Sequence, residues 1–230
     1  MTQAERARRR TRRVREDIRV RLLEAALAEF GAAGFEGAST RAIARRAGAH
    51  QPQINYHFAS KDALWTAAVD HLFAELGRAM AGLDPERSLR GDGGIAALAA
   101  DFADVIRRFV CFAAAHPDLN RIMVHEATTA SRRLAWMTER HVRPLYDRMR
   151  PLWRRLRTAG VAAPIDDRLF HYVLVGAASL LYVNAPEARM LTGVDPTSRR
   201  WVEAHADALV ATLLPHAPRT PRRRRRPVRA

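Results

Sequence analysis

Apolar residues recur at intervals of three and four along almost the whole chain, and no stretch alternates convincingly with a period of two. The clearest early row comprises Val14, Ile18, Leu22, Ala26 and Phe30. A second row comprises Leu64, Ala68, Leu72 and Leu76, and the apolar pattern continues past Met80. This spacing puts the apolar side chains on one face of a helix. The pattern therefore predicts an all-α fold.

The rest of the chain contains further helical patterns, separated by proline, glycine and aspartate. They predict helices over residues 95–115, 118–127, 131–158, 166–183 and 196–214, with one short turn over 186–191. Pro144 and Pro151 fall inside the third of these, and we expect a kink or a break near each because proline removes a backbone donor. Residues 84–94 are predicted to form a loop.

Residues 39–64 are predicted to form two short helices and the capped start of a third. Thr40 is a candidate N-cap for the first short helix. Gly48 follows its last apolar residue, where a left-handed residue commonly ends a helix. The second short helix, over residues 51–58, directs Ile54 and Phe58 inward and is otherwise polar. Such an arrangement is typical of a helix-turn-helix whose second helix reads base edges in the DNA major groove.

This region closely resembles the DNA-binding domain of the TetR family of bacterial transcriptional repressors. The resemblance covers about residues 16–76. It rests on Phe30-Gly31-Ala32-Ala33-Gly34-Phe35, Thr40, Ile43-Ala44, Ala47-Gly48-Ala49, Tyr56-His57-Phe58, Ser60-Lys61 and Leu64. Two positions depart from the family pattern. Ile54-Asn55 stands where a hydrophobic residue and a tyrosine are usual, and Pro52 lies in the first turn of the recognition helix, where it is tolerated.

The resemblance implies a homodimeric, ligand-responsive repressor that binds a palindromic operator in double-stranded DNA. The residues expected to contact DNA are Thr40, Arg41, His50, Gln51, Gln53, Asn55, Tyr56, His57 and Lys61. The helices expected from Asp166 to Val183 and from Pro196 to Leu214 are apolar over a wider face than one neighbour covers. As the resemblance implies, they would form the dimer interface as an intermolecular four-helix bundle; the alternative is the core of a monomer.

The expected organisation follows these patterns. A basic, disordered arm (1–15) precedes the DNA-binding domain (16–76), which contains the helix-turn-helix motif at 39–58. A C-terminal helical domain for effector binding and dimerisation (77–215) precedes a disordered, arginine-rich tail (216–230).

The net charge of +15 is concentrated in the two ends of the chain. Residues 1–21 carry +6 and residues 216–230 carry +7, which leaves +2 on residues 22–215. Blocks of like charge favour polyanionic partners, and nucleic acid is the partner they indicate here. A solvated tail that only aids solubility is the alternative. The tails also support a different function, that of an architectural DNA-binding protein without sequence preference, but that leaves Gln51, Gln53 and Asn55 unexplained.

Large apolar residues and a few polar ones in the C-terminal domain suggest a small-molecule site. The residues expected to bind an effector are Phe102, Ile106, Phe109, Met123, Trp136, Arg140, Tyr146, Phe170 and His171. Arg143 is a further candidate for orienting an anionic group. Ordinary core packing is the alternative for each aromatic side chain. The spacing of His125, His141 and His171 fits no compact metal motif, so no metal and no cofactor are expected beside the effector.

The remaining signals concern compartment and catalysis. The lone Cys111 forms no internal disulfide and is expected to be a small buried hydrophobe. The charged N-terminus does not resemble a signal peptide, and no apolar run reaches about 18 residues, so we expect a protein of the cytoplasm, associated with the nucleoid and without a membrane partner. We find no nucleophile–base pair, phosphate loop or metal motif, and therefore do not expect an enzyme.

Overall fold

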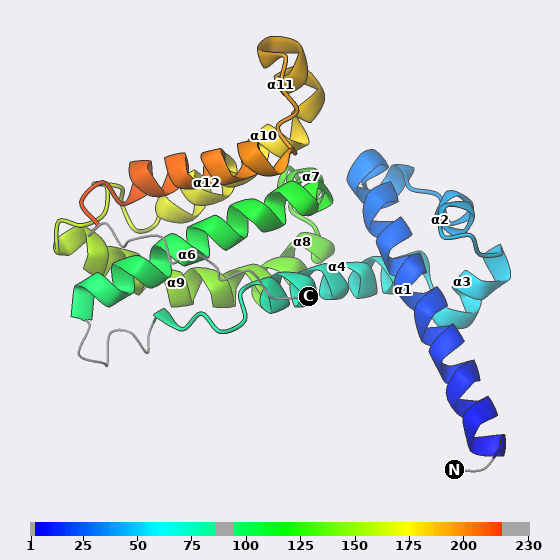
Figure 1. Ribbon diagram of the computed structural model, residues 1–230. Helices are drawn as coiled ribbons and strands as arrows, with labels where there is room; N and C mark the ends of the chain where they lie inside the picture. The colour runs from blue at the N-terminus through cyan, green and yellow to red at the C-terminus, as the bar shows by residue number, and fades with distance from the viewer. Residues whose placement is uncertain (1–2, 86–93, 218–230) are drawn as a thin grey trace, which may run out of the picture.

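The computed structural model describes residues 3–85 and 94–217, and within those residues all regular structure is helical, which confirms the all-α prediction (Figure 1). The N-terminal helices are α1 (Gln3–Gly37), α2 (Thr40–Arg46), α3 (Gln51–His57) and α4 (Lys61–Ala79). They are followed by α6 (Gly94–Ala115), α7 (Pro117–Ala127), α8 (Arg132–Met137), a π-helix (Thr138–Val142), α9 (Arg143–Thr158), α10 (Phe170–Val183), α11 (Ala185–Thr192) and α12 (Arg199–Leu213).

The N-terminal arm differs from the expectation of disorder, because α1 is helical from Gln3. Its sequence from residue 3 to 15 consists mainly of alanine, arginine and glutamate, which are among the strongest helix formers. Like-charge repulsion therefore does not prevent helix formation here. At the other end, Gly34 has a φ of 67° and interrupts α1 one turn before its end. The expectation for the arginine-rich tail lies outside the described residues from position 218 onward.

Three helix starts are shifted from their predicted positions, and one of them is that of α12, which begins at Arg199 and not at Pro196. The N-cap of α2 is Ser39 rather than Thr40, and its Oγ accepts a hydrogen bond from the Ala42 amide at 3.4 Å. The helix predicted from Asp166 begins at Phe170, because residues 167–169 form a turn in which the Leu169 and Phe170 amides donate to the Asp166 carbonyl. Ser60 caps α4 as predicted, accepting from the Ala63 amide at 3.0 Å.

The two prolines in the region of α9 have different effects. The π-helix at Thr138–Val142 runs into α9 with αR backbone angles at Val142 and Arg143, so the helix does not break before Pro144, which lies in the first turn of α9. The change from α-type to π-type hydrogen bonding is the irregularity that the structure has next to this proline. Pro151 lies inside α9, which continues through it to Thr158.

The molecule has two apolar cores, and the first one crosses from the N-terminal helices into the C-terminal ones. Its buried members include Trp65 and Val69 of α4 together with Phe112 of α6, Ile122 of α7 and Met137 of α8. Trp65 also packs edge-on against Trp136, with ring centroids 5.6 Å apart. The second core lies among α6, α9, α10 and α12. The α4 helix is therefore packed against both the other N-terminal helices and the C-terminal body.

Cys111 is exposed, not buried as predicted, because it lies on the same exposed face of α6 as Asp104 and Arg108. Among the described helices, none is both long and apolar enough to cross a membrane. The described residues also contain no group of three side chains suited to holding a metal ion.

Candidate nucleic-acid interface and interior cavity

The helix-turn-helix is formed by α2 and α3 with a tight turn at Gly48. Gly48 has a φ of 62°, and the Ala49 amide closes the turn by donating to the Ala44 carbonyl at 2.9 Å. A residue with a Cβ would be strained at this φ, which explains the glycine. Ile54 and Phe58 are buried beneath α3, as predicted. The opposite surface of α3 is thereby fixed facing outward.

Asn55 and Tyr56 are polar side chains on the outward surface of α3. Both are exposed, and Tyr56 retains 65% of its accessible surface. The exposed Gln51 accepts a hydrogen bond at its Oε1 from the Arg41 Nε of α2, at 3.2 Å. This contact links the two helices on the outer surface. Asn55 thus has its amide available for a base edge.

Gln53 has a structural role that the sequence did not reveal. Its Oε1 accepts a hydrogen bond from the His50 amide at 2.8 Å, which caps the start of α3. The side chain is only partly exposed. A bidentate contact with adenine needs the amide oxygen as an acceptor, and that oxygen is already engaged. Of these two amides among the expected DNA contacts, Asn55 is the better placed to read a base.

Arginines of α1 lie against the recognition helix. The Arg15 guanidinium is 5.6 Å from the centre of the Tyr56 ring, and that of Arg19 is 5.6 Å from the centre of the Phe58 ring. Burial, followed by the positive charges of Arg19 and Arg15, lowers the pKa of His57. His57 is therefore neutral at pH 7 and acts as a hydrogen-bonding group, not as a cation.

The other predicted contact residues divide by position. Arg41 and His50 are exposed, and Thr40 is partly exposed at the start of α2. Lys61 instead turns toward the end of α1, where its Nζ donates to the Glu36 carbonyl at 3.2 Å and lies 4.8 Å from the Phe35 ring centre. Sequence reasoning missed Arg45 and Arg46, which are exposed in the last turn of α2. Their arginine pair just before Gly48 was a visible signal.

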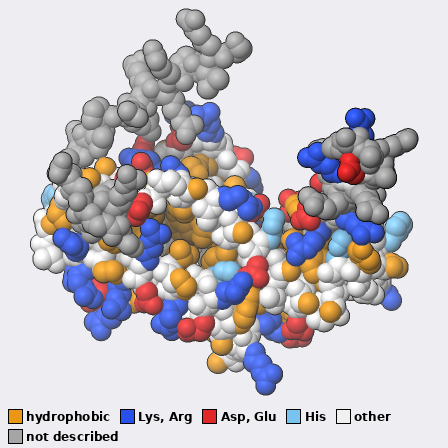
Figure 2. Space-filling view, turned by 90° about the horizontal axis from the view of Figure 1, so that it is seen from below, with side chains coloured by type: hydrophobic (Ala, Val, Ile, Leu, Met, Phe, Trp, Pro, Cys, Tyr) orange, Lys and Arg blue, Asp and Glu red, His pale blue; other side chains and the backbone are white. Residues whose placement is uncertain are grey.

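An apolar cavity of about 420 Å³ lies in the C-terminal body, and Figure 2 shows hydrophobic side chains gathered around a hollow there. Helix α4 contributes Phe73, Leu76 and Gly77 to its wall, and Met80 at its C-cap adds to it. The opposite walls come from α6, α9 and α10, and the residues that follow α4 complete the lining. The volume falls in the usual range of small-molecule sites, about 300–1,000 Å³.

Four of the nine residues predicted to bind an effector line this cavity: Phe109, Tyr146, Phe170 and His171. The other five do not. Phe102 and Ile106 are fully buried in the second core, and Met123 and Trp136 pack against the first core. Arg140 donates to Asp70 of α4 at 2.8 Å, and the further candidate Arg143 donates to Glu139 at 2.9 Å.

The histidines that the sequence analysis considered as metal ligands lie in separate places. His171 lines the cavity, and its pKa is lowered by burial, so the ring is neutral at pH 7. The His141 Nε2 lies 3.0 Å from the Asp70 carboxylate, and its ring stacks on Phe73 with centroids 4.3 Å apart. Because Phe73 also lines the cavity, the ring of His141 lies directly behind the cavity wall.

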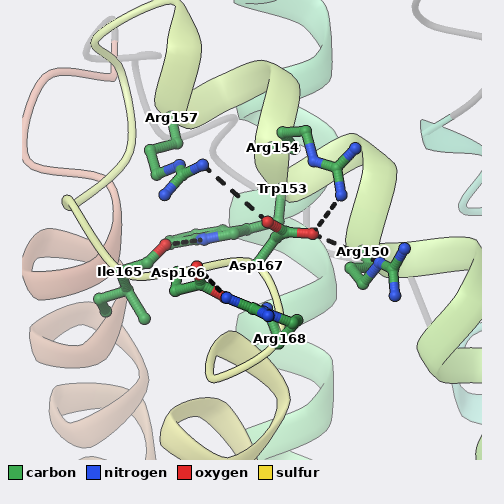
Figure 3. Close-up of polar contacts among 8 residues, drawn as sticks. All are labelled: Arg150, Trp153, Arg154, Arg157, Ile165, Asp166, Asp167 and Arg168. Atoms are coloured by element: carbon green, nitrogen blue, oxygen red, sulfur yellow. Dashed lines mark hydrogen bonds and ion pairs between the residues drawn. The ribbon is translucent and has the colours of Figure 1, made fainter.

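A cluster of arginines surrounds Asp167 beside the cavity (Figure 3). The nearly buried Asp167 carboxylate lies 2.6 Å from Arg154, 3.3 Å from Arg150 and 3.9 Å from Arg157. The hydrogen bond from Arg154 is the main cause of the lowered pKa of Asp167. Next to it, Arg168 pairs with Asp166 at 3.0 Å and lowers the pKa of that carboxyl to about 2. Sequence reasoning did not select these arginines.

Helices α10 and α12 expose apolar side chains along one stripe each. The exposed positions of the first stripe are Leu169, directly before α10, and Tyr172, Val173, Gly176, Ala177 and Leu180 on α10. Tyr172 retains 73% of its accessible surface and Leu180 retains 57%. On α12 the exposed apolar positions are Trp201, Ala204, Ala208 and Ala211. Within one chain these apolar faces remain open to solvent.

Comparison with known proteins agrees with this architecture. The family model described as bacterial regulatory proteins, tetR family, matches residues 22–68, which contain the helix-turn-helix. No curated protein matches the chain in sequence. Among solved structures, AibR in complex with isovaleryl coenzyme A and operator DNA has a TM-score of 0.63 at 17% identity, over 86% of this chain and 99% of that one.

Two other structures have the same fold. The putative transcriptional regulator SCO4942 from Streptomyces coelicolor has a TM-score of 0.56 at 21% identity, over 86% of this chain and 98% of that one. The fatty acid degradation regulator FadR from Bacillus halodurans has a TM-score of 0.55 at 15% identity, over 84% and 94%. The helix-turn-helix within residues 22–68 is thus similar to bacterial regulatory proteins of the tetR family, and the helical body behind it shares the fold of these solved structures.

Proposed function

We propose that the protein is a homodimeric, ligand-responsive transcriptional repressor that binds a palindromic operator. Each subunit would insert α3 into the major groove of one half-site, with Asn55 and Tyr56 facing the bases. Arg41, Arg45 and Arg46 of α2 and Arg15 of α1 would meet phosphates, since half or more of protein–DNA hydrogen bonds go to the backbone.

The observation that supports this proposal is that α4 connects the recognition helix with the wall of the cavity. Its first turn follows α3 directly and is tied to the end of α1 through Lys61. Its last turns form one wall of the cavity through Phe73, Leu76 and Met80. A ligand that displaces this wall would move α3, and DNA requires half-sites about 34–36 Å apart, or a multiple of that, so a small shift weakens binding.

A second copy of the chain is the partner that best fits the exposed stripes of α10 and α12. The small side chains of Gly176, Ala204 and Ala208 allow helices to approach closely, and Tyr172, Leu180 and Trp201 provide large apolar contacts. Dimerisation also supplies the second recognition helix, because a single helix-turn-helix buries little surface on DNA.

An effector that enters the cavity is supported by its size and its apolar walls. The similar structure of AibR was determined with isovaleryl coenzyme A and operator DNA together. An allosteric effector changes DNA affinity by about 5- to 150-fold, a coupling of about 1–3 kcal/mol.

Selection and sequencing of genomic fragments bound by the full-length dimer would test the function. We expect a shared palindrome, protection of both halves in footprinting, and lower transcription from the adjacent promoter when the protein is added in vitro. Fragments without a common sequence would refute specific recognition and favour architectural binding. Higher transcription would instead show that the protein is an activator.

A further inference from the structure

We propose that the cavity and the arginines beside it form one site for an amphiphile with an acyl chain and a phosphate-bearing head. The chain would occupy the cavity, and the head would lie on an arginine ridge, which we define as Arg148, Arg150, Arg154 and Arg157 of α9. This inference deepens the proposed function and rests on it for the regulatory consequence. The binding itself is testable separately.

The polar residues of the cavity all lie on one side. Among the described lining residues, the charged ones are Arg148, Arg150 and Asp167, and they come from α9 and the turn before α10. Tyr146 and His171 lie on the same two elements. The walls from α4 and α6 carry apolar side chains such as Leu76, Met80, Val105 and Phe109. A ligand that fits this distribution is apolar at one end and polar at the other.

The charge on the polar side is strongly positive. The four arginines of the ridge carry +4, and Asp167 in the cavity lining carries −1. Three guanidinium groups share the single carboxylate of Asp167. The nearby Asp84 pairs with Arg148 at 3.4 Å and offsets one of the ridge charges. The remaining excess of positive charge selects an anionic head.

The spacing of the ridge indicates phosphate rather than one carboxylate. Arg150, Arg154 and Arg157 recur at intervals of four and three, so they share one face of α9. Seven residues of helix span about 10 Å, which is more than one carboxylate bridges. The guanidinium fork matches phosphate oxygens in a bidentate manner. A head with one or more phosphates therefore uses the ridge best.

The ridge is separate from the DNA-binding surface. In Figure 1, α9 lies in the C-terminal body and α3 at the far end of the molecule, with the length of α4 between them. The ridge arginines also lie beside the cavity, where Asp167 and Arg150 both form part of its lining. Duplex DNA held by α3 thus leaves this anion site free.

Calorimetric titration of the full-length protein tests the inference with three probes that carry a ten-carbon chain, decanoyl-CoA, decanoyl glycerol phosphate and decanoate, and with CoA, which carries no acyl chain. Both acyl phosphates are expected to bind more tightly than decanoate or CoA, by about tenfold or more, because only they occupy both parts of the site. Whichever of decanoyl-CoA and decanoyl glycerol phosphate binds more tightly shows whether the head is that of a coenzyme A thioester or a glycerol phosphate. Each methylene added up to ten carbons should strengthen binding about fourfold.

The double variant R150Q/R157Q should weaken decanoyl-CoA about tenfold or more, because it removes two charge-assisted contacts. Asp167 retains its closest partner, Arg154, at 2.6 Å, so the fold is expected to persist. R155Q is the matched control, an exposed arginine of α9 outside the cavity lining, and should change binding by about twofold at most. If the glutamine variant unfolds, R150K/R157K still tests the site, since it keeps the charge and loses the fork.

Equal binding of decanoate and decanoyl-CoA, or unchanged binding by R150Q/R157Q, would overturn the inference. So would a lack of binding by both acyl phosphates. Release of operator DNA is measured separately by fluorescence anisotropy. If an acyl phosphate binds tightly through the ridge but does not release the operator, the site is confirmed and the proposed ligand response is refuted.

Discussion

Replacement of Asn55 with alanine is expected to abolish most of the preference for operator over random DNA. Asn55 is exposed on α3, and the proposed contact of its amide with adenine would be worth about 1–3 kcal/mol. A dimer on a palindrome makes the contact twice, so the expected loss is about 2–6 kcal/mol, or at least about thirtyfold in Kd. Binding to random duplex should change little, because it depends mainly on phosphate contacts.

Gln53→Ala provides the comparison. Its amide oxygen caps α3 through the His50 amide at 2.8 Å, and losing such a cap costs about 0.5–2 kcal/mol of folding free energy. We therefore expect a lower Tm and weaker binding to operator and random DNA alike. Asn120→Ala, on α7, removes an amide far from α3 and serves as the control.

The assay is fluorescence anisotropy with the selected operator and a scrambled duplex, accompanied by thermal denaturation. If Asn55→Ala weakens both duplexes equally, base reading by Asn55 is refuted. If Gln53→Ala reduces only operator binding and leaves the Tm unchanged, its capping role is less important than base contact.

Three further predictions follow from the arm, the exposed stripe and the histidines. Removal of residues 1–13, which takes away six arginines, should weaken binding to every duplex and flatten the salt dependence; an unchanged slope would show that the arm makes no phosphate contacts. Gly176→Arg should give a helical monomer in sedimentation, because an added Cβ there meets nothing within 4 Å in one chain, whereas a buried charge between two chains costs several kcal/mol; a persistent dimer would place the interface elsewhere. Burial is the main cause of the lowered pKa values of four histidines: His57, His141, His171 and His205. Below about pH 6.5 the unfolded chain therefore binds more protons than the folded one, and urea titrations should give a smaller free energy of unfolding at pH 5.5 than at pH 7.5. Equal free energies at the two pH values would contradict this.

The helix-turn-helix was predictable because its signals are local. Gly48 marks the turn through its backbone conformation, and Ile54 and Phe58 mark the inward face of α3 through their spacing. The side-chain partners were not predictable in the same way. The capping role of Gln53 and the contact of Lys61 with Glu36 depend on which of several nearby backbone groups a flexible side chain selects.

The cavity was only partly predictable because a core and a pocket are built from the same residue types. Phe102 and Phe109 lie seven positions apart on α6, yet one is fully buried in the core and the other lines the cavity. Among the charged residues, Arg140 and Arg143 were expected to contact the effector, but they pair with Asp70 and Glu139. The three arginines around Asp167 recur on one face of α9, and that periodicity was the available signal.

The shared core has a consequence for building hybrid regulators. A chimera joined after residue 76 would place the foreign surface of one protein against Phe112, Ile122 and Met137 of the other, which are buried in contact with the N-terminal helices. Close packing between α1 and α7 adds to the mismatch, since a Cβ at Gly31 would lie 3.2 Å from the Asp118 Cβ. An exchange of operator specificity is therefore better made by grafting only the outward residues of α2 and α3, because this leaves the contacts between the N-terminal and C-terminal helices intact.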